Sequence, residues 1–177
     1  MDTLCRLMPP VLPSQIDPER LSRKGESISG EYAVNELGRL AGLVYDTEGN
    51  VNFKLEFSFI ENPKLPLITG QLKAHLNLVC QRCLDAFHHQ IEREIKLVVI
   101  NKDFDQETIP AEYEFVVSNH AADLKLKDLI EDEIILAIPI SIMHDENECK
   151  ASKLVKSVNR ENKTSPFAIL KDIGHKQ

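Results

Sequence analysis

The segment "VNFKLEFSF" (residues 51–59) alternates apolar and polar side chains without interruption. Its apolar residues occupy every odd position: Val51, Phe53, Leu55, Phe57 and Phe59. Successive side chains of a β-strand point to opposite faces of the sheet. This period of two therefore predicts a strand with one buried face and one exposed face.

Two segments that follow repeat the same alternation. In "LITGQLKAHLNLVC" (67–80), one face carries Leu72, Ala74, Leu76 and Leu78. In "AFHHQIEREIKLVVI" (86–100), one side carries Phe87, Ile91, Ile95, Leu97 and Val99. Together with residues 51–59, these segments predict three long antiparallel strands in succession.

The segment "LKDLIEDEIILAI" (126–138) has the clearest helical pattern. Leu126, Ile130 and Ile134 recur every four residues, which predicts an amphipathic helix that Pro139 ends. Shorter elements are predicted elsewhere: a helix capped by Asp17, a strand over 26–34, a helix over 35–42 and a strand over 113–117.

These elements predict an α+β fold, in which one main amphipathic helix packs on an antiparallel sheet of long strands. We expect a single domain over residues 1–150, with an irregular N-terminus that is rich in proline. Residues 151–177 are predicted to form a polar linker and a short C-terminal helix, which begins near Ser165.

Composition limits the possible partners and locations. The 177 residues carry a formal net charge of −7, so contact with nucleic acid would require a local basic patch or a protein partner. The longest apolar run, residues 134–143, is too short for a bilayer, and the N-terminus lacks the pattern of a secretory signal. We expect reduced thiols, a cytoplasmic location, no membrane contact and no small-molecule substrate.

The sequence "CQRC" at residues 80–83 indicates a candidate metal site. Cys80 and Cys83 can supply two ligands of a tetrahedral zinc ion, and His144 and Cys149 in "HDENEC" can supply the other two. His88 and His89 are weaker candidates, because a strand directs them to opposite faces. The alternative is a strand connection whose reduced cysteines simply pack.

Two other uses of the cysteine pair fit the sequence poorly. A redox pair places its first cysteine at a helix N-terminus, whereas Cys80 follows a predicted strand. A zinc deaminase requires H-x-E and P-C-x-x-C, but residue 79 is Val and the chain contains no H-x-E. "HD" at 144–145 occurs in some metal phosphohydrolases, but the further ligands of such enzymes are missing here.

Three segments resemble a bacterial protein family. They are "LVCQRCLDAFHHQI" (78–91), "LIEDEIILAIPISIMHDENEC" (129–149) and "SPFAIL" (165–170). Their order and spacing are similar to those of the YceD proteins, the large ribosomal RNA subunit accumulation proteins. The resemblance implies a non-enzymatic cytoplasmic factor for the synthesis, processing or stability of large-subunit (23S) ribosomal RNA. Many relatives carry a second cysteine pair where this chain offers His144 and Cys149, which implies a possible zinc site.

Four acidic residues on the 126–138 helix are candidates for partner binding. Asp128, Glu131, Asp132 and Glu133 could hold a basic large-subunit ribosomal protein or an assembly intermediate. The simpler interpretation is the solvated face of an amphipathic helix. Phe167 and Leu170 could likewise bind a partner, although docking on the chain's own sheet is the simpler explanation.

A second hypothesis is direct contact with ribosomal RNA. Lys73 and His75 share one strand face and Arg82 lies in the cysteine turn, so these residues could meet phosphates. No aromatic residues lie between them to stack on bases, so sequence-specific recognition is not expected. A zinc-dependent RNA-processing enzyme is the remaining alternative.

Overall fold

The computed structural model describes residues 12–118, 124–145 and 147–161. Phe167, Leu170 and the predicted C-terminal helix lie outside these residues. The described chain has the predicted α+β fold and divides into two compact units. The larger unit contains the chain up to Leu78 together with His88–Ile140. The smaller unit contains Val79–Phe87 and the chain from Ser141 onward. The limits at residues 150 and 151 stay a prediction.

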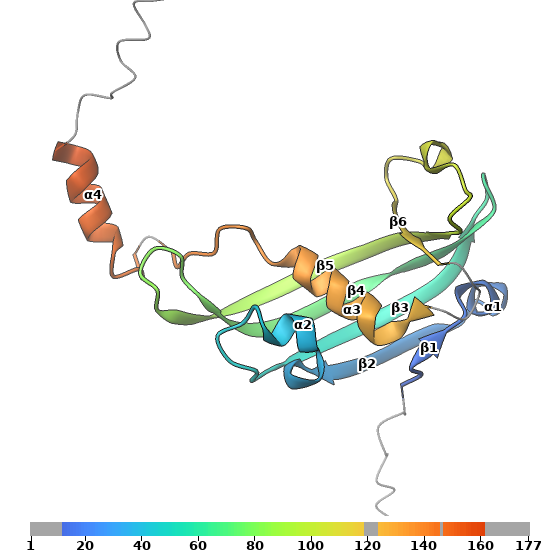
Figure 1. The fold of residues 1–177 in the computed structure, drawn as a ribbon, viewed down its shortest axis with the longest axis horizontal. Helices are drawn as coiled ribbons and strands as arrows, with labels where there is room; N and C mark the ends of the chain where they lie inside the picture. The colour runs from blue at the N-terminus through green and yellow to red at the C-terminus, as the bar shows by residue number, and fades with distance from the viewer. Residues whose placement is uncertain (1–11, 119–123, 146, 162–177) are drawn as a thin grey trace, which may run out of the picture. The chain divides into compact units, whose positions relative to one another are not determined.

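A five-stranded sheet forms the main part of the fold (Figure 1). Its strands lie in chain order: β2 (Ser27–Ala33), β3 (Asn50–Ile60), β4 (Leu65–Val79), β5 (Ala86–Ile100) and β6 (Glu114–Val117). β3 is antiparallel to both β2 and β4, as predicted, whereas β6 runs parallel to β5. The predicted antiparallel sheet of long strands is therefore confirmed, and the short strand β6 is added in parallel at its edge after residues 101–113 cross over. A second sheet pairs β1 (Gln15–Ile16) with β7 (Leu124–Lys125).

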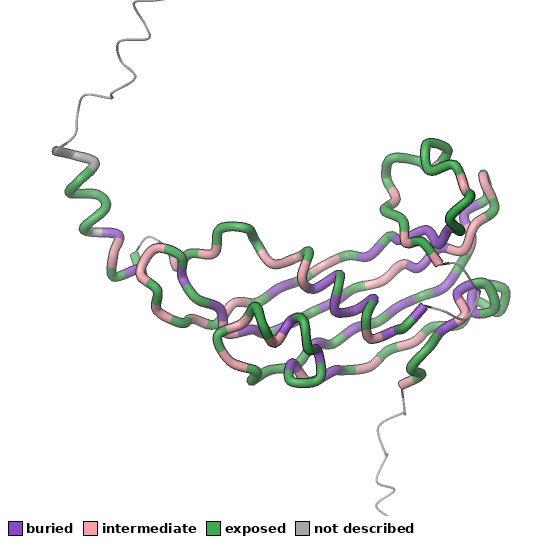
Figure 2. Tube along the Cα trace, viewed as in Figure 1, coloured by how far each residue is buried: buried purple, intermediate pink, exposed green. Residues whose placement is uncertain are grey.

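The alternation in residues 51–59 produces the buried face of β3. Val51, Phe53, Leu55 and Phe57 are buried, and the polar residues between them are exposed (Figure 2). Phe53 lies opposite Leu72, and Phe57 lies opposite Ile68, so the apolar faces of β3 and β4 coincide. The register places these large side chains on one face of the sheet, as the period of two requires.

The helix α3 (Leu126–Ala137) lies across that face of the sheet (Figure 1). Its buried apolar residues repeat with helical spacing and complete the core: Leu126, Leu129, Ile130 and Ile134. The other helices are α1 (Pro18–Lys24), α2 (Gly38–Ala41) and α4 (Ser152–Glu161), with 3-10 turns η1 (Val34–Glu36) and η2 (Gln106–Thr108). None of the helices in the described ranges is long and apolar enough to be a membrane span.

The helix ends follow their sequence signals in α1 but not in α4. The Asp17 side chain accepts a hydrogen bond from the Arg20 N–H at 2.9 Å, and Gly25 ends α1 with φ 61°. The polar linker predicted after residue 150 is instead helical over Ser152–Glu161. Its apolar residues Leu154 and Val158 are four positions apart, but the surrounding polar composition concealed this spacing.

Candidate metal centre

The connection between β4 and β5 forms a tight turn around its cysteine pair. The Cys80 N–H donates to the Asp85 carbonyl at 2.9 Å, and the Leu84 N–H donates to the Cys80 carbonyl at 2.8 Å. Leu84, directly after Cys83, adopts a left-handed backbone conformation with φ 62°. Glycine is the residue that tolerates this conformation best. A non-glycine residue held there is a form of backbone strain that is common at functional sites.

A second turn, far along the chain, positions Cys149 just before α4. The Asp145 carbonyl accepts hydrogen bonds from the N–H groups of Glu148 and Cys149, at 3.0 and 3.1 Å. The Ser152 N–H then donates to the Cys149 carbonyl at 3.0 Å, where α4 begins. Cys149 is therefore fixed between a turn and a helix, and its side chain is buried.

Contacts outside the four candidate ligands hold the two turns together. The Gln81 N–H donates to the Ile142 carbonyl at 2.8 Å. Arg82 Nη1 donates to Ser152 Oγ at 2.8 Å, and Lys150 Nζ lies 3.0 Å from Asp85 Oδ2. All of these residues belong to the smaller unit, so its two segments form one framework around the candidate ligands.

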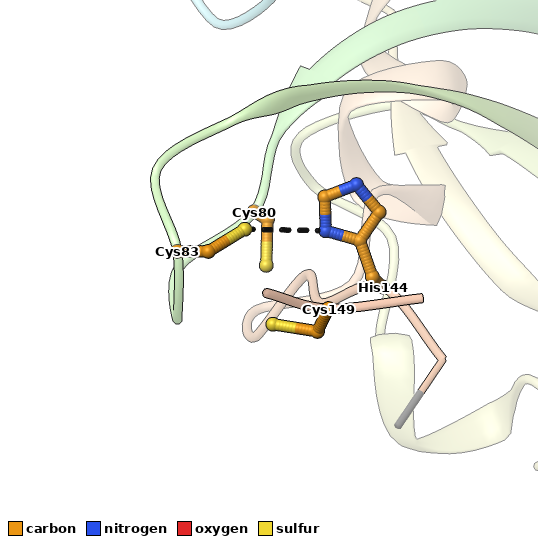
Figure 3. Close-up of side chains that lie close together, drawn as sticks. All are labelled: Cys80, Cys83, His144 and Cys149. Atoms are coloured by element: carbon orange, nitrogen blue, oxygen red, sulfur yellow. Dashed lines mark hydrogen bonds between the residues drawn. The ribbon is translucent and has the colours of Figure 1, made fainter. Parts of the chain in front are cut away.

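The four predicted ligands meet inside this framework. One possible ligand atom from each of Cys80, Cys83, His144 and Cys149 lies within 4.8 Å of those of the other three. Cys83 Sγ is 3.4 Å from His144 Nδ1, and Figure 3 shows the thiols and the imidazole gathered around one space. The Phe87 ring packs against the imidazole, with 4.5 Å between ring centroids.

These dimensions fit a tetrahedral zinc ion. Zinc–sulfur bonds of about 2.3 Å and zinc–nitrogen bonds of about 2.0 Å place neighbouring ligand atoms about 3.5 to 3.8 Å apart. The Cys83–His144 distance of 3.4 Å is close to that value, and the limit of 4.8 Å leaves about 1 Å of closure. The set of three cysteines and one histidine is a common structural zinc set. Cys80, Cys83, His144 and Cys149 would therefore hold the ion.

The pKa values of Cys80 and Cys83 are shifted in opposite directions. Burial opposes the Cys80 thiolate, but backbone hydrogen bonds from Cys83, His144 and Arg82 favour it and lower the Cys80 pKa to about 5. For Cys83, a backbone hydrogen bond from Asp85 favours the thiolate, but burial and the Cys80 and Cys149 sulfurs together raise the pKa. Several thiolates in one small space repel each other, and a divalent cation would remove that repulsion.

The structure separates the residues predicted to contact RNA into two environments. Lys73 and His75 are exposed on β4, and Lys73 Nζ forms an ion pair with Glu92 at 3.1 Å. Arg82 belongs to the smaller unit, where it bonds Ser152 and also lies 3.3 Å from Met143 Sδ. Contact of these three residues with RNA stays a prediction.

The expected exposed row of acids on α3 is wrong at Glu131. This residue is 4% exposed, and its carboxylate accepts hydrogen bonds from the N–H groups of Arg39 and Leu40 at 2.6 and 3.0 Å. Arg39 Nε also donates to Glu131 at 2.9 Å, and the same guanidinium bonds the exposed Asp132. Glu131 therefore holds α2 against α3 within the larger unit, because it satisfies the first N–H groups of α2.

Glu133 is also directed inward rather than toward solvent. It is 3% exposed, and its carboxylate accepts a hydrogen bond from Arg93 Nε at 3.2 Å. Burial raises the Glu133 pKa, although Arg93 acts in the opposite direction. The remaining acid of the predicted row, Asp128, is exposed and lies 3.6 Å from Lys125 Nζ. The sequence offered no signal for Arg39 and Arg93 as the partners of these acids, because both lie far from α3 along the chain.

The fold and the ligand cluster define the class of protein: an α+β protein with a set of three cysteines and one histidine suited to a structural metal. The family model described as "Large ribosomal RNA subunit accumulation protein YceD" matches residues 68–174. The protein of that name from Haemophilus influenzae is 29% identical over 170 residues, which cover 93% of this chain and 97% of the relative. No solved structure matches the chain.

The matched region is more than half of the chain and includes both turns of the cluster. The chain therefore belongs to the YceD family, as its sequence segments predicted.

Proposed function

We propose that this protein supports the accumulation of large-subunit ribosomal RNA as a non-enzymatic binding factor, and that a structural zinc ion holds its smaller unit. Membership of the YceD family supports the role in ribosomal RNA accumulation. The juxtaposition of Cys80, Cys83, His144 and Cys149 carries the structural part of the proposal. We also propose a cytoplasmic location, because three of these ligands are thiols that must stay reduced to bind the ion.

The composition of the ligand set supports a structural rather than a catalytic ion. A catalytic zinc ion commonly keeps one position for water or substrate, whereas a structural ion has four protein ligands. Four protein ligands are available here, and two of them, Cys80 and Cys149, are buried. The ion would cross-link the two turns and would thereby stabilise the folded form of the smaller unit.

The buried acids of α3 change the proposed partner surface. Glu131 and Glu133 are engaged by Arg39 and Arg93, so they are not available to hold a basic ribosomal protein. Binding of such a protein by the exposed residues Asp128 and Asp132 stays a prediction. This leaves ribosomal RNA itself, or a particle that contains it, as the partner to test first.

The test combines cells and purified protein. In cells depleted of the chain, the ratio of large-subunit to small-subunit ribosomal RNA is expected to fall, and the wild-type gene should restore it. Zinc measured by elemental analysis is expected at about one ion per wild-type chain and at much less in the Cys149→Ser variant. Cys5→Ser is the matched control, since Cys5 is the one cysteine of the sequence that is not among the four proposed ligands. An unchanged RNA ratio after depletion would refute the proposed role.

A second assay addresses the enzyme alternative. Purified, zinc-loaded protein is incubated with deproteinised large-subunit ribosomal RNA, and the RNA is then examined on a denaturing gel. We expect no cleavage above that seen with the Cys80→Ser variant. Metal-dependent cleavage that is lost in this variant would show that the protein is an enzyme.

A further inference from the structure

The charge of the chain is distributed very unevenly. Residues 150–177 contain seven Lys or Arg residues and two Asp or Glu residues, a net charge of +5. The whole chain has a net charge of −7, so residues 1–149 carry −12. An acidic protein with a short basic segment is typical of local contact with a polyanion.

The structure places part of this basic segment on a regular helix. α4 spans Ser152–Glu161, and the sequence has cations at positions 153, 156 and 160 within it. These positions are three and four residues apart, a spacing that keeps to one side of a helix. Lys156 is exposed, and so is Lys150 just before the helix.

The helix dipole does not explain the cation at Lys153. The positive end of the helix dipole is the N-terminus, where acids stabilise a helix and cations do not. The first turn of α4 contains Lys153 and no acidic residue. The helix dipole therefore disfavours the cation at Lys153, although it favours the one at Arg160 in the last turn.

The candidate metal centre anchors this helix at its start. Cys149 lies three residues before Ser152, and Arg82 from the cysteine turn bonds Ser152 Oγ at 2.8 Å. Because both contacts belong to the smaller unit, a metal ion at the cluster would also fix the first turn of α4. The basic residues of α4 therefore follow directly from a turn that hydrogen bonds hold in place.

We infer that Lys150 and the basic helix α4 (residues 150–161) contact the phosphate backbone of large-subunit ribosomal RNA. This inference rests on the proposed function, and it names the surface through which that function would act. A basic ribosomal protein fits this segment poorly, because like charges repel. The RNA contact predicted at Lys73, His75 and Arg82 is a separate hypothesis: Lys73 forms an ion pair with Glu92 on the sheet, and Arg82 bonds Ser152.

Binding of the full chain to deproteinised large-subunit ribosomal RNA tests the inference. Affinity is measured by filter binding across a potassium chloride series for wild type and for K153Q/K156Q/R160Q. Each lost phosphate contact lowers the slope of log affinity against log salt by about 0.7 to 0.9, so we expect the slope to fall by about 2. The same arithmetic predicts binding weaker by about tenfold or more at 0.15 M salt.

Three further variants make the result specific. K54Q/K96Q/K125Q removes the same charge from exposed positions of the sheets and should bind RNA as wild type does. K153R/K156R keeps the charge of α4 and should also bind normally. L154S/V158S alters the exposed apolar residues of α4 and is expected to retain RNA binding. Circular dichroism and zinc content establish that each variant is folded.

The outcomes separate this inference from the proposed function. Equal loss of affinity in the sheet variant and the α4 variant would overturn the inference, because net charge alone would then explain binding. Loss of ribosome association only in L154S/V158S would also overturn it, in favour of a protein partner. If the wild-type gene restores large-subunit RNA in cells but the purified chain does not bind that RNA, the inference fails and the proposed function stands. If wild type binds through α4 but has no effect on RNA levels in cells, the proposed function fails.

Discussion

At the scale of single residues, Leu84 shows how the cysteine turn departs from ordinary backbone preferences. Its φ of 62° crowds the Cβ atom against the backbone, and its side chain is 74% exposed, so burial returns little stability. We expect Leu84→Gly to stabilise the smaller unit by about 1 kcal/mol, since glycine removes that crowding. Urea unfolding of the metal-free chain measures the effect.

The same substitution elsewhere in the unit supplies the control. Leu154 is also exposed, but it lies in α4 with helical geometry, so Leu154→Gly should destabilise by about 1 kcal/mol. Opposite signs for the two substitutions would show that backbone conformation decides the result. If both substitutions lower the free energy of unfolding, the backbone at Leu84 is not strained.

Glu131 is the residue whose protonation should matter most within the larger unit. Burial alone would raise its pKa, but hydrogen bonds from the Leu40 N–H and from Arg39 lower the pKa below its usual value. The folded state therefore favours the ionised carboxylate. Its contribution to stability is complete above the unfolded-state pKa and is lost as pH falls through the lowered folded-state pKa.

We therefore expect Glu131→Gln to lower stability by about 2 kcal/mol at pH 7, because a neutral amide oxygen binds the two backbone N–H groups less strongly and the amide nitrogen cannot accept from Arg39 Nε. Arg39 is half exposed, so water weakens its share of the effect. The difference from wild type should shrink as the pH falls through the Glu131 pKa. Asp132→Asn removes an exposed partner of the same arginine and should change stability by about 0.5 kcal/mol. Chemical denaturation at pH 7 measures both variants. Equal losses of stability in Glu131→Gln and Asp132→Asn would contradict the special role of the buried Glu131.

At the scale of secondary structure, the spacing of apolar residues correctly predicted which segments form strands and which form the main helix. The alternation in residues 51–59 became β3 with the expected buried face, and the repeat in residues 126–138 became α3. Local patterns do not encode strand direction at a crossover, so the parallel pairing of β6 was not predicted. The α4 helix was missed because its apolar residues are few and its other residues are polar.

Gly70 illustrates a contact between elements that composition does not reveal. A Cβ atom at this position in β4 would lie 2.1 Å from the Lys54 carbonyl oxygen and 3.0 Å from the Leu55 Cα atom of β3. Because both atoms belong to backbone, the strands must shift to accept a larger residue. We expect Gly70→Ala to lower the free energy of unfolding by about 1 to 3 kcal/mol.

The control for this substitution is Gly38→Ala. A Cβ atom at Gly38, the first residue of α2, would meet no atom within 4 Å, so stability should stay the same or rise. Urea titrations of both variants provide the comparison. Equal stability of Gly70→Ala and wild type would show that the strands have more room than this register allows.

At the scale of the whole molecule, part of the candidate site was readable from sequence and part was not. The spacing of Cys80 and Cys83 and the presence of His144 and Cys149 indicated four ligands, and the fold brings these together from two distant segments. The role of α3 was misjudged because exposure was inferred from residue type. Arg39 and Arg93, each far from α3 in sequence, turn two of its acids into internal ion pairs.

The division of the described chain into two units predicts that metal loss has a local effect. The candidate ligands all lie in the smaller unit, whereas the β3–β4 pairing lies in the larger unit. Bound zinc stabilises only the state that holds it. The equilibrium constant for opening of that state falls by a factor of about a thousand when free zinc exceeds the dissociation constant a thousandfold. We therefore expect a strong chelator to accelerate amide exchange in residues 79–87 and 141–161 by up to that factor, while residues 51–57 exchange as before. Hydrogen exchange with mass spectrometry measures this, and Cys149→Ser should show the same pattern without chelator. Acceleration that is equal in β3 would mean that the sheet also depends on the ion, and unchanged exchange throughout would mean that the cluster holds no metal.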